Sequence, residues 1–111
     1  MDHSDLTDVG TELLEEARAG SAQRAARTLC GGSGHVLRQT AIGIVGGASL
    51  SEHESPGEAT LQVLAGRVRL TWSGEPVDLA AGSHVVIPPE RHALLALDDS
   101  VVLLTTAMSE A

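Results

Sequence analysis

From residue 25 onward the chain breaks into short apolar runs separated by glycine-rich turns, and this pattern constrains its fold most strongly. The runs are rich in Val, Ile, Leu and Thr, and they span about residues 25–30, 35–45, 59–65, 67–73, 77–80, 84–88, 92–97 and 101–107. Many short strands with a turn every ~8–12 residues are typical of an all-β sandwich or barrel. These runs are too short to supply the helices that a parallel sheet needs for its crossovers. The sequence therefore predicts an all-β, antiparallel domain.

Residues 4–19 follow a different period and predict a helix. Their apolar residues recur at spacings of three and four, with acidic residues between them: Leu6, Val9, Leu13, Leu14 and Ala17. Ser4 or Asp5 can cap the start of this helix, and Gly20 can end it. We expect residues 1–20 to pack on the barrel or on a partner subunit, and residues 21–111 to form the barrel of a single domain.

The composition excludes several classes of function. The 111 residues include 15 acidic and 7 basic residues, giving a net charge of −8. This balance argues against nucleic acid and anionic membranes as partners, because both need clustered cations. All the basic residues are Arg, so Schiff-base and P-loop chemistry are unavailable. Trp72 is the single aromatic residue, which excludes an aromatic platform for stacking bases.

The sequence also favours a cytoplasmic protein. Its acidic N-terminus lacks the cationic start and apolar run of a signal peptide. No stretch approaches the roughly 18 apolar residues of a membrane span. Cys30 is the single cysteine, so no intrachain disulfide can form, and a reducing compartment fits best.

Residues 58–64 form an alternating strand whose two faces differ in polarity. Glu58, Thr60, Gln62 and Leu64 share one face, and the alternate residues on the other face are apolar. Periodicity alone leaves two interpretations of the polar face. It either meets solvent or lines the inside of a small barrel.

Residues 47–66 resemble the first sequence motif of the cupin family. That motif has a glycine, then His-x-His, then a Glu, then an apolar strand that ends in Gly. Here His53 matches the first His, Glu58 matches the Glu and Gly66 matches the closing Gly. Ser55 stands where the family has its second His.

Residues 82–94 resemble the second cupin motif, in which a glycine and a proline precede a His, and His92 matches that His. The resemblance covers about residues 34–107. It implies a double-stranded β-helix, that is, a cupin jelly-roll barrel of the RmlC-like type, with a short N-terminal helix. Under that fold the polar face of residues 58–64 is expected to point into the barrel.

The resemblance further implies a metal site made of His53, Glu58 and His92. Two imidazoles and one carboxylate leave coordination positions open for water and substrate, as in facial-triad iron sites and some zinc sites. Ser55 is a poor ligand for a divalent metal, so occupancy is expected to depend on conditions. The sequence does not select among Fe, Zn, Mn, Ni and Cu.

Two functional hypotheses follow from this site. In the first, a small metal-binding cupin binds or transforms a small organic molecule; if it is an enzyme, its activity would be of the oxygenase, isomerase or cyclase type. In the second, the barrel is a non-catalytic ligand-binding or sensor module with a metal-free or degenerate site. The pocket-lining residues are expected to be Gln39, Ser55, Thr60, Gln62, Leu64 and His84. Cupins commonly dimerise, so the resemblance also implies a homodimer.

Overall fold

The computed structural model describes residues 1–53 and 57–107, with the backbone alone for residues 51–53. These residues form one helix and nine strands, and the all-β class with a short N-terminal helix is confirmed. The elements are α1 (Leu6–Ala19), β1 (Arg24–Cys30), β2 (Leu37–Ile44), β3 (Ser49–His53), β4 (Glu58–Ala65), β5 (Arg67–Trp72), β6 (Glu75–Ala80), β7 (His84–Val86), β8 (His92–Ala96) and β9 (Ser100–Ala107).

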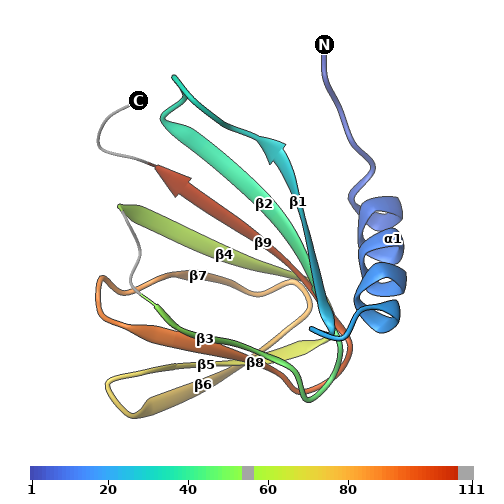
Figure 1. Ribbon diagram of the computed structural model, residues 1–111. Coiled ribbons are helices and arrows are strands. Elements are labelled where there is room, and N and C mark those ends of the chain that lie inside the picture. The colour runs from blue at the N-terminus through green and yellow to red at the C-terminus, as the bar shows by residue number, and fades with distance from the viewer. Residues whose placement is uncertain (54–56, 108–111) are drawn as a thin grey trace.

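The strands form two antiparallel sheets that face each other. The larger sheet has the order β1-β2-β9-β4-β7, and the smaller has the order β3-β8-β5-β6. The sheets approach each other at one end and spread apart at the other, which we call the open end (Figure 1). The start of β4 and the end of β9 lie at the open end, as does the end of β3. Most neighbours in the two sheets are distant in sequence, such as β2 with β9 and β3 with β8, which is the arrangement of a jelly roll.

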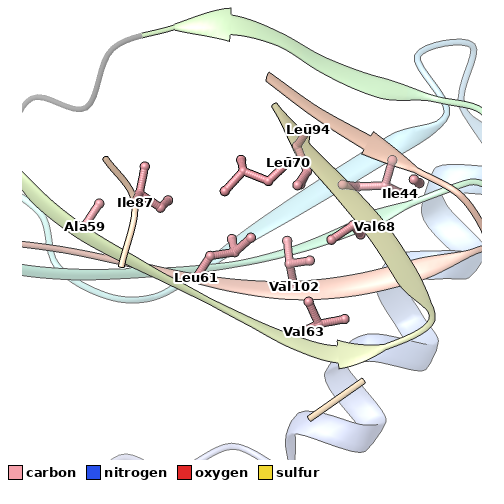
Figure 2. Close-up of a cluster of buried hydrophobic side chains, with 10 residues drawn as sticks. Ile44, Ala59, Leu61, Val63, Val68, Leu70, Ile87, Leu94 and Val102 are labelled. Carbon is pink, nitrogen blue, oxygen red and sulfur yellow. The ribbon is translucent and has the colours of Figure 1, made fainter. Parts of the chain in front are cut away.

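Between the sheets lies an aliphatic core. Each strand turns every second residue inward, and these residues are mostly Val, Leu and Ile. The buried cluster consists of Ile44, Ala59, Leu61, Val63, Val68, Leu70, Ile87, Leu94, Ala96 and Val102 (Figure 2). Trp72 packs against this cluster and is partly buried. The core therefore decides which face of each strand points inward.

Helix α1 covers part of the outer face of the larger sheet (Figure 1). Asp5 caps its start by accepting hydrogen bonds from the backbone N–H groups of Thr7 and Asp8, at 2.9 and 3.1 Å. Gly20 is its C-terminal cap, as the sequence predicted. Among the described residues, no helix is long and apolar enough to span a bilayer.

The helix lies close to the sheet because one strand carries a glycine beneath it. A Cβ built on Gly43 would lie 2.9 Å from the Leu13 backbone carbon and 2.9 Å from the Leu13 Cβ. Leu13 is fully buried and packs with Val9 and Ala41. Gly43 is therefore required for the close approach of α1.

Substitution of Gly43 by Ala is expected to destabilise the protein by about 1–3 kcal/mol, because the added methyl group overlaps the helix backbone. Chemical denaturation measures the loss. The control is Gly20→Ala, whose Cβ would meet the Glu16 carbonyl oxygen at an ordinary 3.4 Å. A Gly43→Ala variant as stable as the control would contradict this packing.

Asp99, in the turn before β9, ties two other segments together. Its carboxylate accepts a 2.8 Å hydrogen bond from the Gly46 backbone N–H and a 2.8 Å hydrogen bond from Arg18 Nη2 of α1. The Gly46 hydrogen bond and then the Arg18 guanidinium hold the pKa of Asp99 below its ordinary value. A lowered folded-state pKa means that this carboxylate stabilises the fold above the pKa of a free aspartate and ceases to do so as pH falls through its folded pKa.

We expect Asp99→Ala to cost about 1 kcal/mol at neutral pH, a modest value because the ion pair is exposed. The difference from the native protein should shrink in strong acid, where Asp99 is protonated in both states. Denaturation curves at a series of pH values measure it, with Asp2→Ala ahead of the helix as the control. A difference that persists unchanged in strong acid would show that the Asp99 charge contributes nothing.

Candidate functional site at the open end of the barrel

Strand register brings two rows of residues to the inner surface of the open end. In the larger sheet, Arg38 pairs with Thr106, and Thr106 pairs with Ala59. In the smaller sheet, His92 pairs with Trp72. These inner rows belong to opposite sheets, at the end where the sheets diverge (Figure 1). They are the candidate functional site.

His92 is the buried polar residue of this site, with 3% of its surface exposed. Its Nδ1 lies 3.0 Å from the backbone carbonyl oxygen of Glu90. A carbonyl oxygen only accepts, so Nδ1 carries the proton and donates. In the neutral ring, Nε2 is then the nitrogen that can accept a hydrogen bond or bind a metal. His92 therefore has the tautomer that a ligand-binding histidine needs.

Backbone pairing places His53 opposite His92, across the β3–β8 ladder. The sequence predicted both as metal ligands, and this register brings the two positions together. The His53 side chain lies outside the described side chains. Ser55 lies outside the described residues altogether.

Glu58 does not join them, which corrects the expectation from the sequence. It is exposed at the start of β4, and the next residue, Ala59, takes the inward position and is buried in the core (Figure 2). The physical reason is the two-residue alternation of a strand, since burying Ala59, Leu61 and Val63 forces Glu58 to the other face. The inward position next to Thr106 thus carries a methyl group and no metal donor.

The rest of that polar face also points outward. Thr60, Gln62 and Leu64 share the face of Glu58, and Gln62 is exposed. Gln62 pairs with His84 of β7, which is exposed as well. The expectation that this face lines the interior is therefore corrected by the same alternation.

Gln39 likewise sits on the outer face of its strand, opposite to the face of Ile42 and Ile44. Its Nε2 donates to Thr105 Oγ1 at 3.2 Å, and its Oε1 lies 3.6 Å from the Cys30 Sγ. The neighbouring residue Arg38 takes the inward position instead. Sequence reasoning missed Arg38, although its spacing from Ile42 and Ile44 is the signal that places all three on one face.

The triad of His53, Glu58 and His92 stays a prediction, because the His53 side chain lies outside the described side chains. In the part of the chain that the structure describes, no group of three or more His, Cys, Asp or Glu side chains is placed to hold a metal ion. On the described inner surface, the side chain that could bind a metal ion is that of His92.

A surface cavity of about 380 Å³ lies at the rim of the same end. It is bordered by the turn after β5 and the segment before β8, and Ser73 Oγ donates to Glu90 Oε2 across it at 2.6 Å. Its lining residues are Thr71, Trp72, Ser73, Gly74, Glu90, Arg91 and Ala93. Of the residues predicted to line a pocket, those that the structure describes do not border this cavity: Gln39, Thr60, Gln62, Leu64 and His84.

Solved structures share this architecture. A conserved protein of unknown function from Streptococcus pyogenes is 27% identical with a TM-score of 0.80, and the match covers 100% of this chain and 93% of that one. A cupin superfamily protein from Desulfitobacterium hafniense is 21% identical with a TM-score of 0.73, covering 84% and 87% of the two chains. An RmlC-like cupin from Shewanella frigidimarina is 21% identical with a TM-score of 0.69, covering 81% and 79%. No family model and no curated protein matches the sequence.

Proposed function

We propose, from the premise that the chain has the fold of the small RmlC-like cupins, that it binds a small organic molecule at the inner surface of the open end. The observation that carries the proposal is the buried His92 ring at the open end, whose Nδ1 lies 3.0 Å from the Glu90 carbonyl oxygen. Below it the interior is aliphatic. A few polar groups at the end of an apolar interior are the arrangement of small-molecule sites.

A fragment screen tests this proposal. We expect small polar organic fragments to shift the amide signals of residues 92–94, 70–72, 38–40 and 59–61 in ¹H–¹⁵N NMR spectra, because these segments carry the inner surface of the open end. We expect His92→Gln to weaken the binding of those fragments, since the histidine acceptor is lost. The control is His84→Gln, which changes an exposed histidine on the outer face.

Two results would overturn the proposal. One is that no fragment binds. The other is that all hits map to the rim cavity at residues 73–74 and 90–91, or to the outer face of β4, with no change near His92. Far-ultraviolet circular dichroism of both variants separates a loss of binding from a loss of fold.

Metal binding is a second candidate, favoured by the pairing of His53 with His92. We propose these two residues, without Glu58, as the protein donors. A divalent metal held there would supply Lewis-acid activation of a bound ligand. An activity of the oxygenase, isomerase or cyclase type would depend on that metal.

Metal analysis of protein made without an affinity tag tests this second candidate. We expect Glu58→Gln to retain the metal content of the native protein, because Glu58 lies on the outer face. We expect His92→Gln to lower it about tenfold or more. Loss of metal in the Glu58 variant would contradict the placement of that residue, and a native protein that binds no Fe, Zn, Mn, Ni or Cu would eliminate the metal candidate alone.

Two further expectations from the sequence stay predictions. They are the homodimer and the cytoplasmic location. The exposed apolar residues Leu37 and Val86 lie at strand positions of the larger sheet.

A further inference from the structure

We propose that Arg38 makes the open end a site for the carboxylate group of a small aliphatic acid. This inference rests on the proposed function and names the ligand class of the same site. It comes from one inward-facing arginine whose Nε has no partner among the described residues, from the hydroxyl groups beside it and from the aliphatic surface beneath.

The position of Arg38 follows from the register of β2. Ile42 and Ile44 of that strand pack in the core between the sheets, whereas Ala41 packs under α1. Pairing of β2 with β9 is regular from Leu37 to Ile44, without a bulge. Arg38 therefore shares the inner face with Ile42 and Ile44, and it lies two alternations beyond Ile42 toward the open end.

Arg38 is half-buried, and one nitrogen of its guanidinium lacks a partner in the part of the chain that the structure describes. Its Nε is buried and has no hydrogen-bond partner among the described residues. No described carboxylate forms an ion pair with it, and Glu58, the acidic residue nearest in the register, lies on the opposite face. A buried N–H without an acceptor destabilises a fold, so such a group calls for an explanation. A ligand oxyanion at Nε would supply the missing acceptor.

The chain makes room for this arginine. Gly31, at the end of β1, has a φ of +126°, a conformation that favours glycine. A Cβ built on Gly31 would lie 2.9 Å from the Arg38 Cγ, so any larger residue would displace the arginine stem. The absence of a side chain at residue 31 therefore helps to set the position of the guanidinium.

The neighbours of Arg38 define the ligand class. Thr106 pairs directly with Arg38, and Thr40 lies one alternation further in; both are half-buried and add hydroxyl groups to the inner face. In the row of Thr40 the next two strands supply aliphatic side chains, since Thr40 pairs with Leu104 of β9 and Leu104 pairs with Leu61 of β4. A guanidinium binds a carboxylate with two parallel hydrogen bonds, and the leucines below favour a short hydrocarbon chain.

The negative net charge of the protein opposes the binding of an anionic ligand. With a formal charge of −8, the molecule as a whole repels anions. Binding of a carboxylate therefore has to come from a local cation rather than from the general field. A variant that replaces an arginine elsewhere changes the net charge of the protein by the same amount, and it therefore provides a matched control.

The test is an NMR titration of the native protein with valerate, with its neutral amide valeramide, and with inorganic phosphate. We expect valerate to bind more tightly than valeramide and to shift the Arg38 Nε–H signal. Arg38→Gln should weaken valerate binding about tenfold or more and change valeramide binding less than about twofold. Arg67→Gln, which removes an exposed arginine from the outer face of β5, should change neither.

The other outcomes contradict either the assignment of a carboxylate ligand or the proposed binding of a small molecule at the open end. If valerate and valeramide bind equally at the open end, the carboxylate inference is wrong and the proposed function stands. If phosphate binds as tightly as valerate, the site recognises any oxyanion and the assignment to aliphatic acids is wrong. If neither organic probe binds there and no neutral fragment does, the proposed function fails as well.

The thermal stability of the unliganded variants distinguishes a binding role of Arg38 from a structural one. If Arg38 held the fold together, its replacement would lower the melting temperature. A cation kept for binding lacks partners in the free protein, so Arg38→Gln should leave the melting temperature unchanged or raise it. Arg38→Lys, which keeps the charge but loses Nε, should bind valerate more weakly than the native protein. A large loss of stability in both variants would assign Arg38 to the fold and contradict the proposal.

Discussion

The alternation of side chains across three paired strands, β2, β9 and β4, is the constraint on which the rest of the structure depends. Their register aligns Ile42 with Val102 and Val102 with Val63, and packing of this row between the sheets fixes one face of each strand as the inner face. Each buried side chain of this size contributes roughly 1.5–3 kcal/mol, so a slip of one residue would expose the whole row to water. The chemistry of the open end is a consequence of this packing.

Because of this alternation, the inner surface of the open end carries the cation Arg38 and lacks the carboxylate of Glu58. Ala59 rather than Glu58 faces inward on β4, and Arg38 rather than Gln39 faces inward on β2. The inner surface therefore presents a cation, hydroxyl groups and the His92 ring, where the sequence motif had implied two imidazoles and a carboxylate. Such a surface is suited to holding an anionic ligand more than to holding a divalent cation.

The fold was predictable from sequence because it depends on many residues at once. Glycine-punctuated runs indicated the strands, the cupin resemblance named the jelly roll, and Asp5 and Gly20 marked the ends of α1. The strand β3 was missed because its residues, Ser49–His53, are mostly polar.

The site was harder to predict, because a shift of one residue along a strand moves a side chain to the opposite face of the sheet. The spacing from His53 to Glu58 fits the motif, but the packing of Leu61 and Val63 decides which face Glu58 occupies. Local spacing does not reveal that packing.

Thiol accessibility at residues 58 and 59 is a direct measure of which face of β4 points into the barrel. Single cysteines replace Glu58 or Ala59 in a Cys30→Ser background, and the rate of reaction with a small soluble thiol reagent is measured under native conditions. The account predicts fast modification at residue 58, which is exposed, and slow modification at residue 59, where the native side chain has 5% of its surface exposed. Faster reaction at residue 59 than at residue 58, in variants with native circular dichroism, would contradict the assignment of faces on which the site is built.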